Sequence, residues 1–125
     1  MALVMQKPTF FNEWPESWKQ SYAYDCQEVW SDVTDYGYAY AYQNRADKTL
    51  QAVSSRLEKG QRILDIAGAQ GNFSIRLAEM GYQVTWNDLR SELESYVRLK
   101  QGDCTLEFAP GNAFEWEHLV FWQSG

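Results

Sequence analysis

The chain has 125 residues, of which 45% are apolar and 16% aromatic, so it can form one domain with a core and is not a disordered segment. Its net charge is −6, and no basic stripe is present, which disfavours electrostatic capture of nucleic acid. The cysteines Cys26 and Cys104 are isolated and His118 is the single histidine, so neither a disulfide framework nor a metal site is expected.

The first part of the chain predicts a helix over residues 12–30. Asn12 is a suitable capping residue, and Pro15 falls in the first turn, where proline is tolerated. Aromatic and apolar side chains share one face at helical spacing: Trp18, Tyr22, Cys26 and Val29. We expect residues 1–35 to form an N-terminal helical segment outside the sheet. Packing against the domain is the simpler interpretation of that face, and a lid over a ligand pocket is the alternative.

A second helix is predicted from about Tyr40 to Lys59. The preceding residues 36–42 alternate tyrosine with small residues like a strand, but an apolar stripe at helical spacing continues after them: Ala46, Leu50, Val53 and Leu57. Gly60 is a typical helix end. Tyr38, Tyr42 and Arg45 could reach a ligand, although exposure to solvent is the simpler account of these side chains.

Residues 62–89 organise the rest of the chain. A short apolar strand, Ile63–Ile66, contains Asp65, and the glycines Gly68 and Gly71 follow it. Asn72 can then cap a helix that runs to a stop at Gly81. A second strand, residues 82–87, ends on the acid Asp88. This order predicts one βαβ unit of a nucleotide-binding sheet, in which the acid can accept both hydroxyls of a ribose.

The chain after Asp88 predicts one more helix and one more strand. Ser91 and Glu94 form a capping-box pattern, and the helical period continues to Lys100. The third strand is expected at residues 104–109, before a turn at Pro110. The fold class is therefore α/β, a Rossmann-like parallel half-sheet in the order 3-2-1, flanked by helices.

The first strand and its turn resemble motif I of the class I methyltransferases that use S-adenosyl-L-methionine. That motif has an acid followed by glycines two, four and six places later. Asp65 matches the acid and Gly71 the last glycine, whereas Ala67 and Ala69 replace the first two, with Gly68 between them. Because alanine is small enough to keep the turn tight, the turn is interpreted as a variant of the motif.

Two further segments extend this resemblance. Asp88 matches the family's ribose-binding acid, and Leu89 the apolar neighbour that packs on adenine. The segment Gly111-Asn112-Ala113 resembles the family's Gly-Asp-Ala, with an asparagine oxygen that can still accept a hydrogen bond. The resemblance covers residues 36–117. It implies a site for S-adenosyl-L-methionine made of Asp65, Ala67, Gly68, Gln70, Gly71, Asp88, Leu89, Asn112 and Ala113.

Structural roles are the alternatives for two of these residues. Asp65 can hold the glycine turn through hydrogen bonds to backbone amides, and Asn112 fits ordinary turn chemistry after Pro110 and Gly111. For Asp88, ribose binding is favoured over a structural role, because an acid that ends a buried strand beside a nucleotide-type turn has few structural reasons to be there.

The resemblance implies transfer of a methyl group to an unidentified acceptor, for which a small molecule is favoured over nucleic acid. No catalytic residue is identified. The rival interpretations are a non-catalytic S-adenosyl-L-methionine-binding module or subunit completed by a partner, and a dinucleotide-binding oxidoreductase. The second is disfavoured because the Gly-x-Gly-x-x-Gly spacing is absent.

The extent of the chain leads to expectations about assembly and location. The family would continue with a fourth strand and three more, whereas here only residues 118–122 could form a short fourth strand. Residues 36–125 are therefore expected to be an incomplete domain that self-associates through the exposed edge of its first strand. The N-terminal apolar run is too short for a signal peptide or a membrane span, which favours a cytoplasmic location.

Overall fold

The structure, a computed structural model, describes residues 5–32, 35–66 and 68–112. In chain order the elements are α1 (Glu16–Glu28), α2 (Gly37–Ser54), β1 (Arg62–Asp65), α3 (Asn72–Glu79), β2 (Gln83–Asp88), α4 (Leu93–Lys100) and β3 (Leu106–Pro110). Every strand and helix predicted for these residues is present, with bounds shifted by up to five residues. The possible short strand at residues 118–122 lies outside the described residues.

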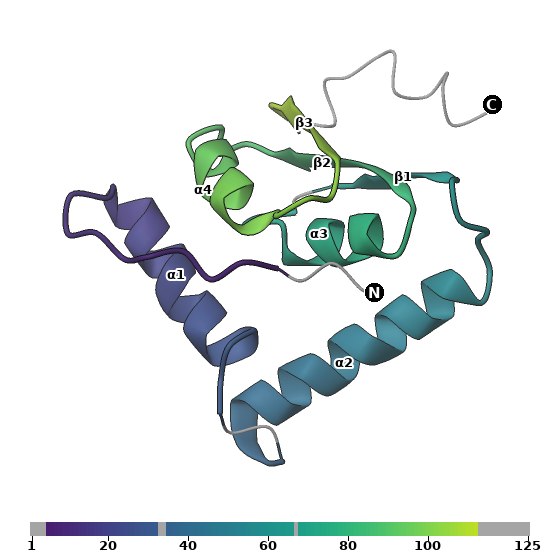
Figure 1. Cartoon of the computed structure of the whole chain (residues 1–125), viewed down its shortest axis with the longest axis horizontal. Helices are drawn as coiled ribbons and strands as arrows, with labels where there is room; N and C mark the ends of the chain where they lie inside the picture. Colours follow the sequence, from purple (N-terminus) through teal and green to yellow (C-terminus); the bar gives the residue numbers. More distant parts are fainter. Residues whose placement is uncertain (1–4, 33–34, 67, 113–125) are drawn as a thin grey trace.

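The three strands form one parallel sheet in the order β1-β2-β3 (Figure 1). Ile63 of β1 pairs with Val84 of β2, which pairs in turn with Leu106 of β3. The predicted α/β half-sheet is therefore confirmed, and the chain has a Rossmann-like fold. Because the strands are parallel, their carboxyl ends meet at one edge of the sheet, which is where ligands bind in open α/β sheets.

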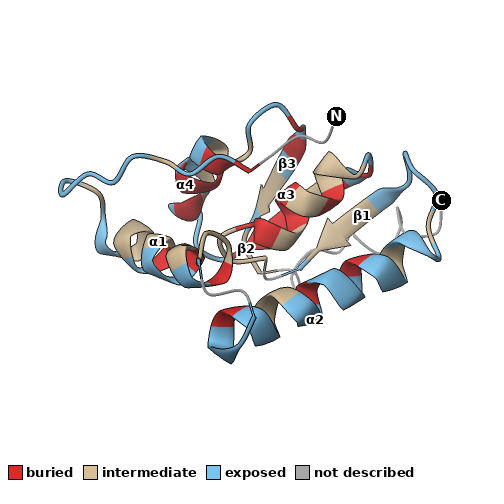
Figure 2. Cartoon of the chain, turned by 60° about the horizontal axis from the view of Figure 1, so that its bottom comes forward, coloured by how far each residue is buried: buried red, intermediate tan, exposed pale blue. Residues whose placement is uncertain are grey.

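The core lies between the sheet and the helices α3 and α4, which cover the same face (Figure 1). Side chains of β2 alternate accordingly: Val84 and Trp86 are buried, whereas Gln83 is exposed and Thr85 half-buried on the other face. Ile75, Leu77 and Val97 complete this core from the helices. Figure 2 shows the buried residues gathered on α3, α4 and the middle of the sheet.

The helix α1 packs against α2 and α4. An aromatic cluster forms part of this contact, in which the ring centroids of Trp14 and Trp18 lie 5.8 and 5.9 Å from that of Tyr96 in α4. Trp18 also donates its indole N–H to the Glu92 carbonyl at 2.8 Å. None of the described helices is long and apolar enough to cross a membrane.

The predicted start of the first helix is wrong. It begins at Glu16, not after Asn12, because a residue before proline is disfavoured in the helical region and Trp14 precedes Pro15. Its buried residues are polar: Ser21, Asp25 and Glu28. The predicted stripe of Trp18, Tyr22, Cys26 and Val29 is half-buried and packs against the domain: Trp18 contacts Tyr96 of α4, and Val29 packs against the core.

Two other helix ends differ from the prediction. Helix α2 begins at Gly37 and ends at Ser54, where Ser54 and Ser55 donate their hydroxyls to the Gln51 and Ala52 carbonyls and so satisfy the last turn. The capping box at the start of α4 does not form.

At that helix start, backbone N–H groups close the turn. Leu93 donates to the Arg90 carbonyl, and Glu94 to the Ser91 carbonyl. No side chain caps the helix, and the Glu94 carboxylate pairs with Arg98 at 3.3 Å.

Candidate functional site: a glycine turn at the carboxyl edge of the sheet

The turn between β1 and α3 is tightly packed. The Gly68 N–H donates to the Asn87 carbonyl, and the Gly71 N–H to the Gly68 carbonyl, both at 2.8 Å. A Cβ atom on Gly68 would lie 3.1 Å from both Asp65 Oδ2 and the Trp86 ring, closer than nearly all real Cβ contacts. A side chain at Gly68 would therefore require Asp65 or Trp86 to shift, although Gly68 lies between two glycine positions of the motif and matches neither.

Two further residues of the turn, Ala69 and Gly71, have left-handed backbone conformations. Gly71 has φ +74°, and a Cβ atom there would lie 3.0 Å from the Val97 side chain. Ala69 has φ +50°, so an alanine adopts the conformation that glycine usually supplies. Small size is therefore only part of what this position requires. Ala67 lies outside the described residues.

The Asp88 carboxylate connects this turn to the end of β2 through hydrogen bonds. Its Oδ2 atom accepts the Ala69 N–H at 2.9 Å, and its Oδ1 atom accepts both the backbone N–H and the Nε–H of Arg90, at 2.9 and 3.0 Å. Burial opposes ionisation of this carboxyl, but the hydrogen bonds from Arg90 and Ala69 outweigh it and lower its pKa. Asp88 thus has a structural role that the sequence did not indicate.

Asp65 faces the inner side of the same turn. Its Oδ2 atom accepts the hydroxyl of Ser74 at 2.7 Å. Burial raises the pKa of the Asp65 carboxyl, with a further contribution from the charge of Asp88, while the hydrogen bond from Ser74 opposes the shift. The two strand-end acids therefore titrate in opposite directions from their ordinary values.

The third strand ends beside the second. Asn87 donates its side-chain amide to the carbonyls of Ala109 and Gly111, at 2.9 and 2.8 Å, and the Gly111 N–H donates to the Asp88 carbonyl at 3.2 Å. These bonds bring the Gly111-Asn112 segment to the same edge as the glycine turn. The sequence analysis did not single out Asn87, which has no motif position and is recognised only by its contacts.

The remaining predicted site residues have different surroundings. Leu89, beside Asp88, is 71% exposed. Gln70 and Asn112 are half-buried, and Ala113 lies outside the described residues. Tyr38 is exposed and donates its hydroxyl to Glu28 at 2.6 Å, and Arg45 is exposed on α2.

A hollow of about 220 Å³ borders the turn and is lined by Glu28, Tyr42, Asp65, Gly68, Ala69, Gln70, Asn72 and Phe73. It brings the end of α1 and the start of α2 against the predicted cofactor motif. Burial, with the charges of Glu28 and Asp25, raises the pKa of Tyr42 to about 12, so this phenol stays protonated and can donate a hydrogen bond.

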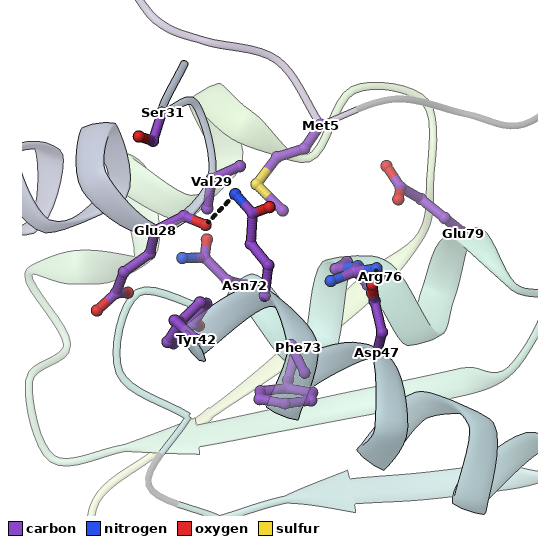
Figure 3. A pocket seen from close by; sticks show the side chains of 12 residues that line it. Met5, Glu28, Val29, Ser31, Tyr42, Asp47, Asn72, Phe73, Arg76 and Glu79 are labelled. Atoms are coloured by element: carbon purple, nitrogen blue, oxygen red, sulfur yellow. Dashed lines mark hydrogen bonds and ion pairs between the residues drawn. The ribbon is translucent and has the colours of Figure 1, made fainter. Parts of the chain in front are cut away.

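A second hollow of about 410 Å³ lies beside the first and shares four lining residues with it: Glu28, Tyr42, Asn72 and Phe73. Figure 3 shows it from close by, with Arg76 and Asp47 together on one side and Glu79 farther along α3. Arg76 pairs with Asp47 at 2.8 Å. Together the two hollows form an extended concave surface between α1, α2 and α3.

A buried ion pair lies next to the turn, between Asp25 of α1 and Lys100 of α4, with 2.8 Å between the charged atoms and no exposure of either side chain. The sequence analysis missed it. Lys100 occupies an apolar position of the helical period in α4, and that position was the available signal. No comparable signal marks Asp25, which sits on a polar helix face.

The chain is similar in sequence to a known protein. Over 54 residues, 43% of the chain, it is 41% identical to the "Putative methyltransferase YqeM" of Bacillus subtilis (strain 168). The resemblance to a methyltransferase is confirmed. The chain spans 22% of that relative's length. No protein-family model matches the chain.

One solved structure supports the fold, and a second is similar over a shorter part of the chain. The PH0226 protein from Pyrococcus horikoshii OT3 matches 83% of the chain with a TM-score of 0.52 and 18% identity. The TehB-like SAM-dependent methyltransferase from Corynebacterium glutamicum matches 58% of it with a TM-score of 0.43 and 20% identity. The chain covers 45% and 44% of these structures, respectively, so its likeness is to a part of each.

Proposed function

We propose that this chain binds S-adenosyl-L-methionine at the carboxyl edge of its sheet and is the cofactor-binding part of a methyltransferase. The observation that carries the proposal is the hydrogen bond from the glycine turn to Asp88, which brings motif I and the strand-end acid together. The 41% identity to a methyltransferase supports the same assignment.

The residues at this edge suit such a cofactor. Its ribose needs acceptors, and Asp88 is a carboxylate with four lone-pair sites, of which the Ala69 and Arg90 backbone groups occupy two. The Arg90 side chain is half exposed, so it can leave Oδ1 to a hydroxyl. The ammonium group of its amino acid part suits the hollow lined by Asp65 and Glu28.

Leu89 and Asn112 are assigned to the adenine end in this proposal. Leu89 is exposed beside Asp88 and offers an apolar surface for a base. Asn112 follows Gly111, which is bonded to the Asp88 carbonyl, so it belongs to the same edge. The side-chain oxygen of an asparagine accepts a hydrogen bond from an amine.

The bound cofactor would supply a methyl group on a sulfonium, activated for in-line displacement. For such a transfer the protein mainly positions the reactants and excludes water, which can supply much of the rate. The hollow of about 410 Å³ next to the turn is the space that this chain offers to a small acceptor. Because the chain spans 22% of its relative's length, we propose cofactor binding for this chain and methyl transfer only for a whole protein of that kind.

A cytoplasmic location is the remaining part of the proposal. Cys26 and Cys104 are both free thiols, which suits a reducing compartment.

Among the described residues, no group of three or more histidine, cysteine or acidic side chains could hold a metal ion.

Titration calorimetry with S-adenosylhomocysteine tests the cofactor assignment. Loss of a hydrogen bond to a charged group costs about 1.5–3 kcal/mol, so Asp88→Ala should weaken binding by roughly ten- to a hundred-fold. Glu107→Ala is the matched control, because Glu107 is an exposed acid on the neighbouring strand. Equal affinities of the Asp88 variant and the wild type would remove Asp88 from the site.

A further inference from the structure

Five side chains form a buried polar cluster beneath the glycine turn, which we call the Asp25 cluster: Asp25, Gln70, Asn72, Tyr96 and Lys100. Asp25 comes from α1, Gln70 from the turn and Asn72 from the start of α3, while Tyr96 and Lys100 lie in the middle and at the end of α4. Asp25, Tyr96 and Lys100 are fully buried, and Asn72 is 7% exposed. The cluster therefore joins the N-terminal helix to the predicted cofactor motif.

Every charged atom in the cluster has partners. The Lys100 ammonium donates three hydrogen bonds, to Asp25 Oδ2 at 2.8 Å and to the Gln70 carbonyl and Asn72 Oδ1 at 2.7 Å. The Asp25 carboxylate also accepts the Tyr96 hydroxyl at 2.7 Å. An ammonium has three protons to donate, so Lys100 is fully satisfied without water.

The same carboxylate holds the turn through its other oxygen. Asp25 Oδ1 accepts the side-chain amides of Asn72 at 2.6 Å and of Gln70 at 3.2 Å. Gln70 is thus bound twice, by its side chain to Asp25 and by its carbonyl to Lys100. Asn72, the first residue of α3, is bound by the same two residues.

The turn is consequently fixed from both sides. On one side Asp88 accepts the N–H of Ala69, and on the other Asp25 and Lys100 bind the two residues that flank Gly71. Ala69 has a positive φ, a conformation that is strained for an alanine and needs support from its surroundings to persist. The Asp25 cluster is built to supply that support from α1 and α4.

We propose that Asp25 and Lys100 are positioning residues that hold the turn of residues 68–72 in the conformation that binds the cofactor, so that docking of α1 and cofactor affinity are coupled. This inference rests on the proposed function. By thermodynamic linkage the coupling is reciprocal, so a bound cofactor would also hold α1 in place. Helix α1 would then be an integral part of the binding site.

The test needs a variant that removes the cluster without leaving a charge buried. Replacing one partner of a buried ion pair strands the other and is strongly destabilising, whereas replacing both by apolar residues of similar volume is often neutral. The double variant Asp25→Leu/Lys100→Met meets this condition. Leu50→Ala is the control, because it opens a cavity in the buried part of α2 away from the turn.

Two measurements report on each chain: amide hydrogen exchange of residues 68–72 without ligand, and calorimetric affinity for S-adenosylhomocysteine. In the double variant we expect exchange of the turn to be about tenfold faster and affinity about tenfold lower. The two factors are equal because both measurements report the same loss of stability of the turn. In Leu50→Ala the exchange rate of the turn and the affinity should both stay within about threefold of the wild type, because the cavity lies in α2 and leaves the hydrogen bonds of the turn unchanged.

The outcomes separate the two proposals. A double variant with unchanged exchange, or with wild-type affinity, would overturn the coupling. A wild type that does not bind the probe would contradict the proposed function, while faster exchange in the double variant would still support the positioning of the turn. Should the double variant not fold, Tyr96→Phe removes one bond to Asp25 and should shift both measurements in the same direction by a smaller factor; no shift would overturn the coupling.

Discussion

Ala69 donates its backbone N–H to Asp88 at 2.9 Å from a left-handed conformation, with φ +50°. The left-handed region costs an L-residue about 1–2 kcal/mol, and glycine escapes this cost. The hydrogen bond that joins the turn to the second strand is therefore made by a strained alanine. The family's motif has a glycine at this position, and the strain shows what that glycine avoids.

Ala69→Gly should stabilise the fold. Relief of the left-handed strain exceeds the extra entropy that glycine gains in the unfolded chain, which leaves about 1 kcal/mol in favour of the variant. Urea unfolding of both chains measures the difference. Ala78→Gly, within α3, is the control and should lose about 1 kcal/mol. A less stable Ala69→Gly would mean that the alanine carries no strain.

Gly71→Ala should cost more stability than Gly60→Ala. Both glycines have positive φ, at +74° and +89°, so both substitutions carry backbone strain. Only at Gly71 would the new Cβ atom meet a neighbour, the Val97 side chain at 3.0 Å, whereas nothing lies within 4 Å at Gly60. Overpacking adds about 1–3 kcal/mol, measured by denaturant unfolding.

Val97→Ala gives a check on that interpretation. It should recover part of the loss in Gly71→Ala, because it removes the atoms that the new Cβ would meet. Equal costs at the two glycines would show that backbone strain alone matters there.

The two strand-end acids should give stability opposite dependences on pH. The pKa of Asp88 is lowered in the folded chain, so its contribution to the free energy of unfolding is complete above its ordinary value of 3.8 and is lost as the pH falls further. The pKa of Asp65 is raised, so its ionisation costs stability as the pH rises above 3.8.

Unfolding of Asp88→Asn and Asp65→Asn between about pH 3 and 7 tests this, since that range spans ordinary carboxyl pKa values. The stability of the wild type relative to Asp88→Asn should rise with pH, and its stability relative to Asp65→Asn should fall with pH. The same sign of slope for both variants would contradict the proposed environments of these carboxyls.

The chain should discriminate against nicotinamide dinucleotides. A pyrophosphate requires the close backbone approach that the spacing Gly-x-Gly-x-x-Gly provides. That spacing is absent here, and the turn contains Ala69, whose methyl group hinders such an approach. In thermal-shift measurements, S-adenosylhomocysteine should raise the melting temperature more than NAD does. A larger shift with NAD would favour the oxidoreductase interpretation.

We also predict self-association through β1. Within the described residues β1 pairs with β2 alone, which leaves its other edge open, and Ile66 just after it is 52% exposed. An open apolar edge favours pairing with another chain. Light scattering coupled to size exclusion should show dimers or larger species, reduced in Ile66→Lys. A monomeric wild type would contradict this prediction.

Local patterns were enough to predict the sheet and its turn. The strand that ends on Asp88 and the glycines after β1 are recognised from neighbours in the sequence, and the order of the strands followed from the βαβ connections. Asp65, Gly68 and Asp88 meet at one edge as predicted.

Long-range polar contacts could not be predicted in the same way. Asp25 lies on the polar face of α1, a face that local rules assign to solvent, and it is buried because Lys100 and Tyr96 meet it there. The capping pattern at Ser91 and Glu94 failed for a similar reason: Arg98 competes for the Glu94 carboxylate. In each case the partner, which periodicity does not reveal, decides the outcome.

The distance along the chain between Asp25 and Lys100 has a consequence for folding. The two residues are separated by 75 positions, and closing so long a loop costs entropy that only the finished cluster repays. During synthesis α1 and α2, which pack together, are made first, yet Asp25 has no cationic partner until α4 exists. We therefore expect the Asp25 carboxylate to stay hydrated until α4 is made, so that closure of the Asp25 cluster comes late in folding.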